Sequence, residues 1–252
     1  MNHPAELAIN QYLEDATSGK SSMSEETITQ IGTDVMDAMR RQFGGGNKRD
    51  EFRLRMSNIG KPTCQLWFAK NKPETALPKP TTFVMNMLLG DIVEAAFKGI
   101  IKEAGVPYED KDNFITLELG GETIKGSYDL VMDGALDDVK SASDWSYRNK
   151  FASYDTLAKS DPFGYVGQLA GYTKATGKKV GGWWVVNKAN GNIKYVPADG
   201  LVLDDEIAKL EETVKTINDN KFERCFEPVP ETFRGKESGN MILNDNCKFC
   251  DF

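Results

Sequence analysis

The segment from Ile124 to Lys140 reads Ile-Lys-Gly-Ser-Tyr-Asp-Leu-Val-Met-Asp-Gly-Ala-Leu-Asp-Asp-Val-Lys, and it decides how the surrounding chain folds. Asp133-Gly134 lies between two strand-like runs, where it is the strongest short signal for a β-hairpin, because a type I′ turn needs positive φ at both central residues. We therefore expect an antiparallel pair, with one strand from Ile124 to Met132 and the other from Ala135 to Ser141.

The register of this hairpin brings three charged side chains together. If the turn has two residues, counting outward from it places Asp129 opposite Asp138, and facing side chains share one side of the sheet with Cβ atoms roughly 5 Å apart. Because side chains alternate along a strand, Lys140 shares the face of Asp138 and lies opposite Ser127. The sequence thus predicts two carboxylates and an ammonium on one patch.

Two facing carboxylates repel each other unless a cation lies between them. A hard divalent ion such as Mg²⁺ or Mn²⁺ suits this position, because it prefers oxygen ligands and keeps waters that a substrate phosphate can displace. Lys140 would then orient or deprotonate a water molecule. The alternative is a solvated strand face, on which Lys140 is only a surface ion partner of Asp129 and Asp138.

A long helix precedes the hairpin. Its apolar pattern runs from Phe83 to Ala104, and Gly105 follows at the position where a helix end favours glycine. Glu94 falls on the apolar stripe of this helix, so its carboxylate is expected to be partly buried and to need a partner. A metal ion shared with the hairpin would supply that partner, and the alternative is an ion pair with Lys98, one turn along the helix.

The remaining pattern alternates helices and strands. Residues 1–43 are expected to form two helices, the second from Glu25 to Phe43, and Gly44-Gly45-Gly46-Asn47 then interrupts the pattern. We therefore divide the chain into a helical N-terminal extension, residues 1–45, and a main domain, residues 46–252. The further elements expected in this domain are strands at Phe114–Leu119, Gly182–Asn187 and Ile193–Val196 and helices at Tyr165–Thr176 and Asp204–Asn220.

These elements predict a mixed α/β fold, in which helices flank a central mixed sheet that includes a three-strand antiparallel unit. The 252 residues, 40% of them hydrophobic, are enough to bury one sizeable core. No apolar run approaches the roughly 18 residues of a membrane span, and residues 1–15 lack the pattern of a secretion signal. We therefore expect a cytoplasmic protein of a bacterium or phage, with no membrane partner.

Charge and histidine content narrow the chemistry. The formal charge of -7 argues against a surface coated with Lys and Arg for tight phosphate binding, although a protein that gathers acids around metal ions can also be acidic overall. His3 is the single histidine, which argues against histidine-based triads and His-rich zinc catalysis. Acid–base chemistry would therefore use carboxylates, Lys, Tyr or metal-bound water.

Four short motifs follow one another along the chain. They are Gly-x-x-x-Glu from Gly90 to Glu94, Gly-x-x-Asp from Gly126 to Asp129, Asp-x-Lys from Asp138 to Lys140, and Gln-x-x-x-Tyr from Gln168 to Tyr172. In this order they resemble the RecB-like nucleases of the PD-(D/E)xK superfamily, over about residues 50–252. The segment Arg55-Met-Ser57-Asn-Ile-Gly60, leading into Cys64-Gln-Leu-Trp67, is similar to phage and CRISPR-associated RecB-like exonucleases. The resemblance implies a restriction-endonuclease-like sheet flanked by helices.

The resemblance also implies a role for each motif residue. In that family three acids and one backbone carbonyl hold the metal, and their counterparts here are Glu94, Asp129, Asp138 and the carbonyl of Val139. Lys140 would serve the attacking water, while Gln168 and Tyr172 would contact the DNA backbone and steady the lysine. The third motif often has Glu where this chain has Asp, and the shorter side chain changes the metal spacing. Without the family argument, Tyr172 is also explained as a residue that packs on the sheet.

Four cysteines divide into Cys64 before the motifs and Cys225, Cys247 and Cys250 after them. In related RecB-like nucleases such a set binds a [4Fe–4S] cluster that ties the chain ends together, so the resemblance implies an iron–sulfur centre, with Zn²⁺ as the alternative. The spacing departs from the family, because Cys225 lies well before the terminal pair instead of beside it. Cys64 as a buried residue and Cys225 as a free thiol stay open as alternatives.

The activity that the resemblance implies is hydrolysis of phosphodiester bonds at DNA ends, by a metal-dependent exonuclease of recombination, repair or phage DNA metabolism. Single-stranded DNA is the expected substrate, and the products would bear 5′-phosphate and 3′-hydroxyl ends. Candidate DNA contacts are Arg55, Ser57, Tyr147, Arg148 and Lys188, with Trp145 as a stacking residue. The aromatic candidates are also explained as core or loop-anchoring residues, and Lys188 as a solvated turn residue.

Two other functions stay open for the same residues. One is a structure-selective endonuclease with the same centre, and the other is a non-catalytic DNA-binding subunit that keeps the fold. For the N-terminal helices we expect a role in binding a protein partner or in self-association.

Overall fold

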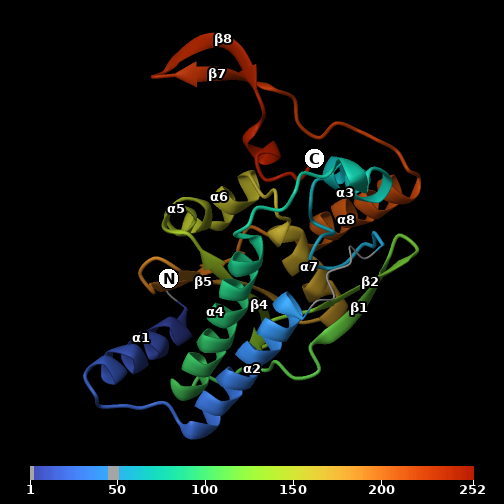
Figure 1. Ribbon diagram of the computed structural model, residues 1–252. Helices are drawn as coiled ribbons and strands as arrows, with labels where there is room; N and C mark the ends of the chain where they lie inside the picture. Colours follow the sequence, from blue (N-terminus) through green and yellow to red (C-terminus); the bar gives the residue numbers. More distant parts are fainter. Residues whose placement is uncertain (1–2, 45–50) are drawn as a thin grey trace.

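The structure is a computed structural model that describes residues 3–44 and 51–252. Its central sheet has four strands, in the order β3 (Leu130–Met132), β4 (Ala135–Ala142), β5 (Lys179–Asn187) and β6 (Ile193–Pro197). β4 and β5 are parallel, β3 and β6 run antiparallel to their neighbours, and helices surround the sheet (Figure 1). The predicted fold class, a mixed sheet flanked by helices, is confirmed.

The Asp-Gly hairpin forms as predicted. Asp133 and Gly134 have φ angles of 51° and 74°, and the residues on either side of this two-residue turn pair with each other. Leu130 faces Asp137, so the next step outward along the same register puts Asp129 opposite Asp138. The turn therefore aligns the two acids.

The strand expected from Ile124 to Met132 is wrong in one respect, because the chain divides it into two. β1 (Phe114–Leu119) and β2 (Glu122–Ser127) form a separate two-stranded sheet. Ser127 faces Phe114 and not Lys140. The predicted three-strand antiparallel unit is therefore also wrong.

The side chain of Asp129 explains why the ladder of the hairpin stops. Asp129 lies just before β3, and its Oδ2 atom accepts the backbone N–H of Val139 at 2.7 Å. A longer β3 would have offered a backbone carbonyl to this N–H, so the carboxylate takes the place of a ladder hydrogen bond. At Val139, the edge of β4 is therefore bonded to the Asp129 side chain and not to the neighbouring strand that was expected.

Helices bury the two faces of the sheet against separate cores. On one face, α4 (Phe83–Glu103) and α1 (Pro4–Thr17) pack Phe97, Ile101 and Ile9 against Trp184. On the other face, α7 (Tyr165–Thr176) and α8 (Leu203–Asn218) pack with β1 and β2 around Trp183. Adjacent tryptophans of β5 thus point to opposite cores, as the alternation of a strand requires.

The two N-terminal helices, α1 and α2 (Glu25–Phe43), form as expected and pack on α4. α2 lies along α4 (Figure 1), so closely that a Cβ atom on Gly99 would lie 2.4 Å from Ile31 Cδ1. α1 adds Ala5 and Ile9 to the core around Trp184. The predicted domain boundary between residues 45 and 46, and most of the glycine run, lie outside the described residues.

Several short elements were not predicted from the sequence. They are α3 (Thr63–Asn71), α5 (Asp144–Arg148), α6 (Tyr154–Lys159), β7 (Val229–Phe233), β8 (Lys236–Ile242) and 3₁₀ turns at Pro73–Thr75, Lys150–Ala152 and Asp245–Cys247. The hairpin of β7 and β8 projects from the body of the molecule (Figure 1). Among the helices of the described ranges, none has the length and apolar character needed to cross a membrane.

Candidate active site

Asp138 and Lys140 lie at the centre of the site, on β4. Lys140 Nζ is 2.8 Å from Asp138 Oδ1 and 2.7 Å from Asp138 Oδ2. Burial favours a lower pKa for Lys140, but the carboxylates of Asp138 and Asp129 outweigh it and hold this pKa above its ordinary value. The lysine is therefore an ammonium at neutral pH.

Asp129 adds a second, half-buried carboxylate beside this pair. Burial first, and then the negative charges of Asp138 and Glu94, raise the pKa of Asp129 to about 8. Burial also raises the pKa of Asp138, against the opposing effect of Lys140. Asp138 Oδ2 makes no hydrogen bond, although Lys140 lies beside it as an ion-pair partner. The structure thus brings together the two acids that the hairpin register placed opposite each other. Lys140 alone cannot balance the charges of two carboxylates.

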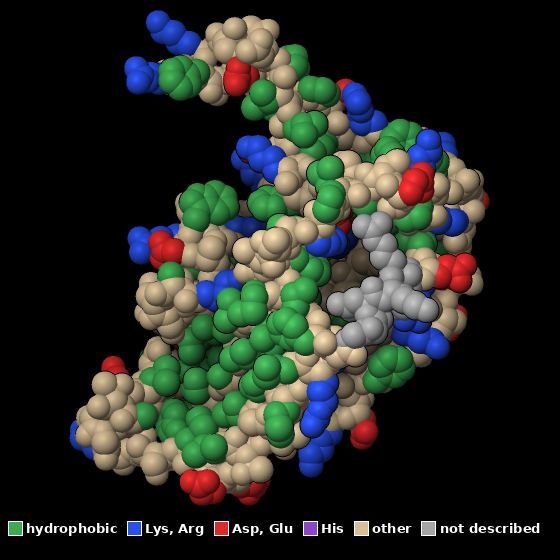
Figure 2. Space-filling model, in the orientation of Figure 1, with side chains coloured by type: hydrophobic (Ala, Val, Ile, Leu, Met, Phe, Trp, Pro, Cys, Tyr) green, Lys and Arg blue, Asp and Glu red, His purple; other side chains and the backbone are tan. Residues whose placement is uncertain are grey.

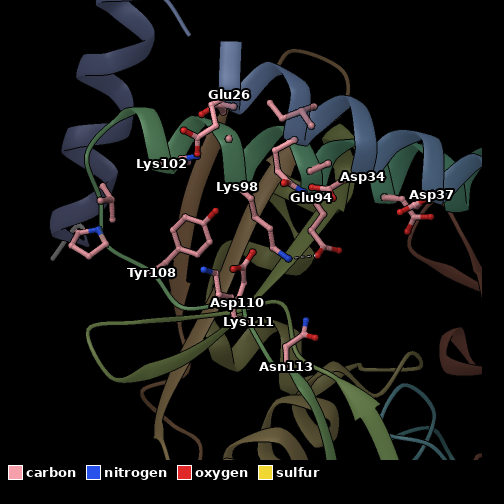
Figure 3. A pocket seen from close by; sticks show the side chains of 18 of the residues that line it. Glu26, Asp34, Asp37, Glu94, Lys98, Lys102, Tyr108, Asp110, Lys111 and Asn113 are labelled. Atoms are coloured by element: carbon pink, nitrogen blue, oxygen red, sulfur yellow. Dashed lines mark hydrogen bonds and ion pairs between the residues drawn. The ribbon is translucent and has the colours of Figure 1, made fainter. Parts of the chain in front are cut away.

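Glu94 reaches this region from α4, in the wall of a cavity of about 960 Å³ between α2, α4 and the loop before β1 (Figure 3). Its Oε1 atom accepts a hydrogen bond from Lys98 Nζ at 2.7 Å, so the ion pair named as the alternative is present. Burial favours a lower pKa for Lys98, but Glu94 and then Asp129 hold it above its ordinary value. The negative charge of Glu94 raises the pKa values of both Asp129 and Asp138, which places Glu94 near them. In this state the carboxylate of Glu94 is paired with Lys98.

α7 directs Gln168 and Tyr172 toward β4. Gln168 Oε1 lies 3.3 Å from Lys140 Nζ, and a hydrogen bond joins Gln168 to the buried Tyr172 hydroxyl, whose pKa burial raises to about 12. Gly126 of β2 leaves room for this ring, since a Cβ atom there would lie 2.9 Å from Tyr172 Oη and 2.6 Å from Met56 Cβ. Tyr172 therefore packs in the core and also continues a hydrogen-bonded chain to Lys140.

Tyr165, at the start of α7, was not predicted as a site residue. Lys140 Nζ lies 4.8 Å from the centre of its ring, in a cation–π contact. The carboxylate of Asp161 fixes this end of the helix by accepting the N–H groups of Gly164 and Val166 at 3.0 and 2.9 Å. Gly164, the N-cap residue, has a φ angle of 76° and no side-chain cap hydrogen bond, so no capping motif in the sequence marks Tyr165.

A groove of about 1030 Å³ includes Gln168 and Tyr172 in its wall. Four cations line it, namely Arg53, Arg55, Lys70 and Lys125. The predicted contact Ser57 and the ring of Phe114 lie in the same wall, and Glu122 is the only acid among its described lining residues. The groove therefore carries positive charge next to the catalytic candidates, and it contains two of the predicted DNA contacts.

The other predicted DNA contacts do not line this groove. Trp145 is 68% exposed on α5, and Arg148 is exposed at the end of the same helix. Tyr147 is half-buried, with Lys194 Nζ 4.3 Å from the centre of its ring. Lys188 is exposed where β5 ends. The structure consequently separates these residues from the groove residues with which they were grouped.

The four cysteines lie in two pairs, without a disulfide. The Cys64 N–H lies 3.0 Å from Cys225 Sγ, and the Cys250 N–H is bound to the Cys247 carbonyl in one turn near the C-terminus. A hydrogen bond with Cys64, helped by the Thr63 hydroxyl, lowers the pKa of Cys225 to about 6. Burial raises the pKa of Cys247, and the charges of Cys250 and Cys225 add to this effect. Cys225 thus acts electrostatically on Cys247, although within the described residues no three of the cysteines are gathered around one point that suits a metal ion.

The end of the chain returns to the segment that carries Cys64. Phe252 stacks on Phe68 of α3 with ring centres 5.6 Å apart, and the Leu77 N–H donates to the Asp251 carbonyl at 2.6 Å. These contacts hold the C-terminal segment against the segment that carries Cys64.

The donor atoms of the site fit a hard divalent cation. Asp129, Asp138 and Glu94 offer carboxylate oxygens, which Mg²⁺ and Mn²⁺ prefer, and the carbonyl of Val139 belongs to the same stretch of β4. Asp138 Oδ2 lacks a hydrogen bond, and an added cation would relieve the repulsion between the acids. Within the ranges that the structure describes, no three acidic, histidine or cysteine side chains are already gathered around one point that suits an ion.

Comparison with known proteins gives no family for this chain. No protein-family model matches it, and no curated protein matches it. Among solved structures it is similar to the crystal structure of SSO0001, with a TM-score of 0.42 and 10% sequence identity, covering 81% of this chain and 91% of that one. The function is therefore argued from the site itself.

Proposed function

We propose that this protein is a metal-dependent deoxyribonuclease of the PD-(D/E)xK superfamily, with its centre at Glu94, Asp129, Asp138 and Lys140. The observation that carries the proposal is the buried cluster on β4, in which Lys140 lies within 2.8 Å of Asp138 while Asp129 binds the backbone N–H between them. Buried acids that raise each other's pKa destabilise a fold and concentrate at functional sites. The order of the four sequence motifs supports the same assignment.

Hydrolysis of a phosphodiester needs a water in line with the leaving oxygen and a way to neutralise charge on the phosphate. Asp129, Asp138 and the Val139 carbonyl are the groups that would hold Mg²⁺ or Mn²⁺, joined by Glu94 when it leaves Lys98. When bound, such an ion makes water more acidic and neutralises the charge that develops on the phosphate oxygens. The carboxylates that would bind the ion are already shielded from bulk water by the surrounding protein, so binding the ion removes little further water from them.

Lys140 supplies a positioned positive charge and a proton donor. Asp138 and Gln168 hold its ammonium from two sides, and the Tyr165 ring packs against it. Because the pKa of Lys140 lies above its ordinary value, the lysine donates hydrogen bonds in this state and orients a water molecule. Tyr172 supports this position through Gln168.

The basic groove is the part of the surface that suits the DNA strand. Its four cations can neutralise phosphates, and Gln168 and Tyr172 connect its wall to Lys140. Phe114 is exposed in the same wall and offers a face for base stacking. The preference for DNA ends, for single strands and for 5′-phosphate products is carried over from the family resemblance.

We propose a [4Fe–4S] cluster on Cys64, Cys225, Cys247 and Cys250, with Zn²⁺ as the alternative. Three observations support it: the contact between Cys64 and Cys225, the effect of Cys225 on Cys247, and the lowered pKa of Cys225. A lowered pKa favours the thiolate, which is the form that binds a metal. The bound group would join the two ends of the chain.

The experiment that tests the nuclease follows degradation of 5′-labelled and 3′-labelled single-stranded and duplex DNA with Mg²⁺ or Mn²⁺. We expect the wild type to cleave and Lys140→Ala to be at least about 100-fold slower, because a positioned proton donor contributes about that much. The label released first gives the polarity. Cleavage within circular single strands would favour the endonuclease, and no cleavage by folded, metal-replete protein would favour the non-catalytic subunit.

A further inference from the structure

The β7–β8 hairpin stands out because it is ordered without a core of its own. Every residue of β8 is exposed, and Phe233 at the end of β7 is 69% exposed. A two-stranded hairpin without a packed face is only marginally stable in water, so contact with a bound partner would stabilise it. The hairpin projects from the body (Figure 1) and overhangs a notch in the molecular surface (Figure 2).

The tip of the hairpin combines an aromatic ring with two cations. Phe233 pairs with Lys236 across a two-residue turn, Arg234-Gly235, whose φ angles are 52° and 78°. The Arg234 guanidinium lies 5.3 Å from the centre of the Phe233 ring. Glu231, by contrast, lies farther back along β7, where Ser238 and Asn240 bind its carboxylate. Glu237 pairs with Thr232 next to the tip, so the tip presents two cations and an exposed aromatic ring beside one acid.

The opposite side of the notch carries side chains of the same two kinds. In the common orientation of Figures 1 and 2, the notch separates the hairpin from α5 and α6. α5 exposes Trp145 and Arg148, an aromatic ring and a cation that do not line the basic groove. Figure 2 shows Lys and Arg side chains at the hairpin tip and on the body below it.

We propose that the β7–β8 hairpin is an arm that binds single-stranded DNA, with a base stacked on Phe233 and phosphates bound by Arg234 and Lys236. Stacking on an aromatic side chain and neutralisation of phosphates are the two contacts by which proteins bind single strands. The arm deepens the proposed function by adding a substrate contact outside the catalytic centre, and it rests on that function for the choice of DNA.

The test measures binding of a fluorescent single-stranded oligonucleotide to the full chain with Ca²⁺ in place of the activating ion, over a range of salt concentrations. Arg234→Asn combined with Lys236→Gln removes both charges, and Asn tolerates the positive φ of the turn. We expect the salt dependence of log affinity to fall by about 1.4, which is about 0.7 for each lost phosphate contact. Phe233→Ala should weaken binding by about fivefold or more, the low end of the range for base stacking.

The matched control is Lys209→Gln combined with Lys215→Gln, which removes two exposed charges from α8 and should leave the salt dependence unchanged. Wild-type affinity and salt dependence in the hairpin variants would overturn the proposal, and so would a dimer in sedimentation that these variants abolish. Hydrolysis of bis(p-nitrophenyl) phosphate with Mn²⁺ separates the two hypotheses. Failure of this reaction in the wild type contradicts the nuclease, whereas unchanged DNA binding in the variants contradicts only the arm.

Discussion

Lys98 Nζ lies 2.7 Å from Glu94 Oε1, and this ion pair sits beside the two acids of the hairpin. Two lysines thus divide the three acids of the site, since Lys98 holds Glu94 while Lys140 holds Asp138. A divalent ion that recruits Glu94 has to compete with the Lys98 ammonium. In the proposed metal site, Lys98 would therefore limit the affinity for the ion.

Lys98→Met should therefore tighten Mn²⁺ binding several-fold, because it removes the competing charge and keeps an apolar stem in the same place. Electron paramagnetic resonance of free Mn²⁺ measures the affinity without any need for turnover. Lys102→Met, one turn further along α4 and paired with the exposed Glu26, is the control and should leave the affinity unchanged. Weaker binding in Lys98→Met would show that the lysine supports the site instead of competing for it.

The raised pKa of Asp129 predicts how the stability of the metal-free protein depends on pH. Its pKa is about 8 in the folded protein and 3.8 in a model peptide, so between these values the folded state keeps a proton that the unfolded chain loses. The free energy of unfolding contributed by this group therefore decreases as pH rises from about 4 to about 8. Urea unfolding in EDTA at pH 5 and pH 8 should show a smaller decrease for Asp129→Asn than for the wild type. Equal decreases in the two proteins would contradict the assignment.

Gly126→Ala tests whether the space beside Tyr172 is needed. The added Cβ atom would lie 2.6 Å from Met56 Cβ and 2.9 Å from Tyr172 Oη, so we expect a loss of about 1–3 kcal/mol in the free energy of unfolding and slower hydrolysis. Gly32→Ala in α2 has no atom within 4 Å and should instead stabilise by up to about 1 kcal/mol. A Gly126→Ala protein as stable as the wild type would mean that β2 can shift away from α7 without loss of free energy. That result would contradict the need for space beside Tyr172.

The cysteine centre predicts the colour and metal content of the protein. Anaerobically purified wild type should be brown and contain iron and sulfide, and Cys225→Ser should lose both and unfold at lower temperature, because a ligand of the folded state is removed. Iron and zinc are measured by elemental analysis of the same sample. Colourless protein with bound zinc would support the alternative, and protein with neither metal would contradict a four-cysteine centre.

Much of the candidate site was predictable because one local signal decided it. Asp133-Gly134 requires a two-residue turn, and strand periodicity then places Asp129, Asp138 and Lys140 without any long-range information. The long helix and Glu94 followed from apolar spacing and a terminal glycine. Even the ion pair with Lys98 was among the stated alternatives, since residues four apart on a helix meet.

The features that the sequence did not reveal depend on contacts between distant segments. The strand pattern from Ile124 onward continues without a break. It reveals neither the Asp129 side chain that takes the place of the ladder at Val139 nor the packing of β2 against Met56 and Tyr172. Tyr165 joins the site because α7 docks beside Lys140. The β7–β8 hairpin escaped notice because β8 is exposed throughout and mostly polar, while β7 is short and contains Pro230, which argues against a strand.

The most direct test of the central claim compares DNA cleavage and Mn²⁺ binding in the wild type and in Asp138→Asn, which preserves the size of the side chain and removes its charge. We predict that the wild type binds Mn²⁺ and cleaves single-stranded DNA, and that Asp138→Asn, still folded, loses both properties together. Cleavage by Asp138→Asn at the wild-type rate, or the absence of cleavage by metal-replete wild type, would contradict a nuclease centred on β4.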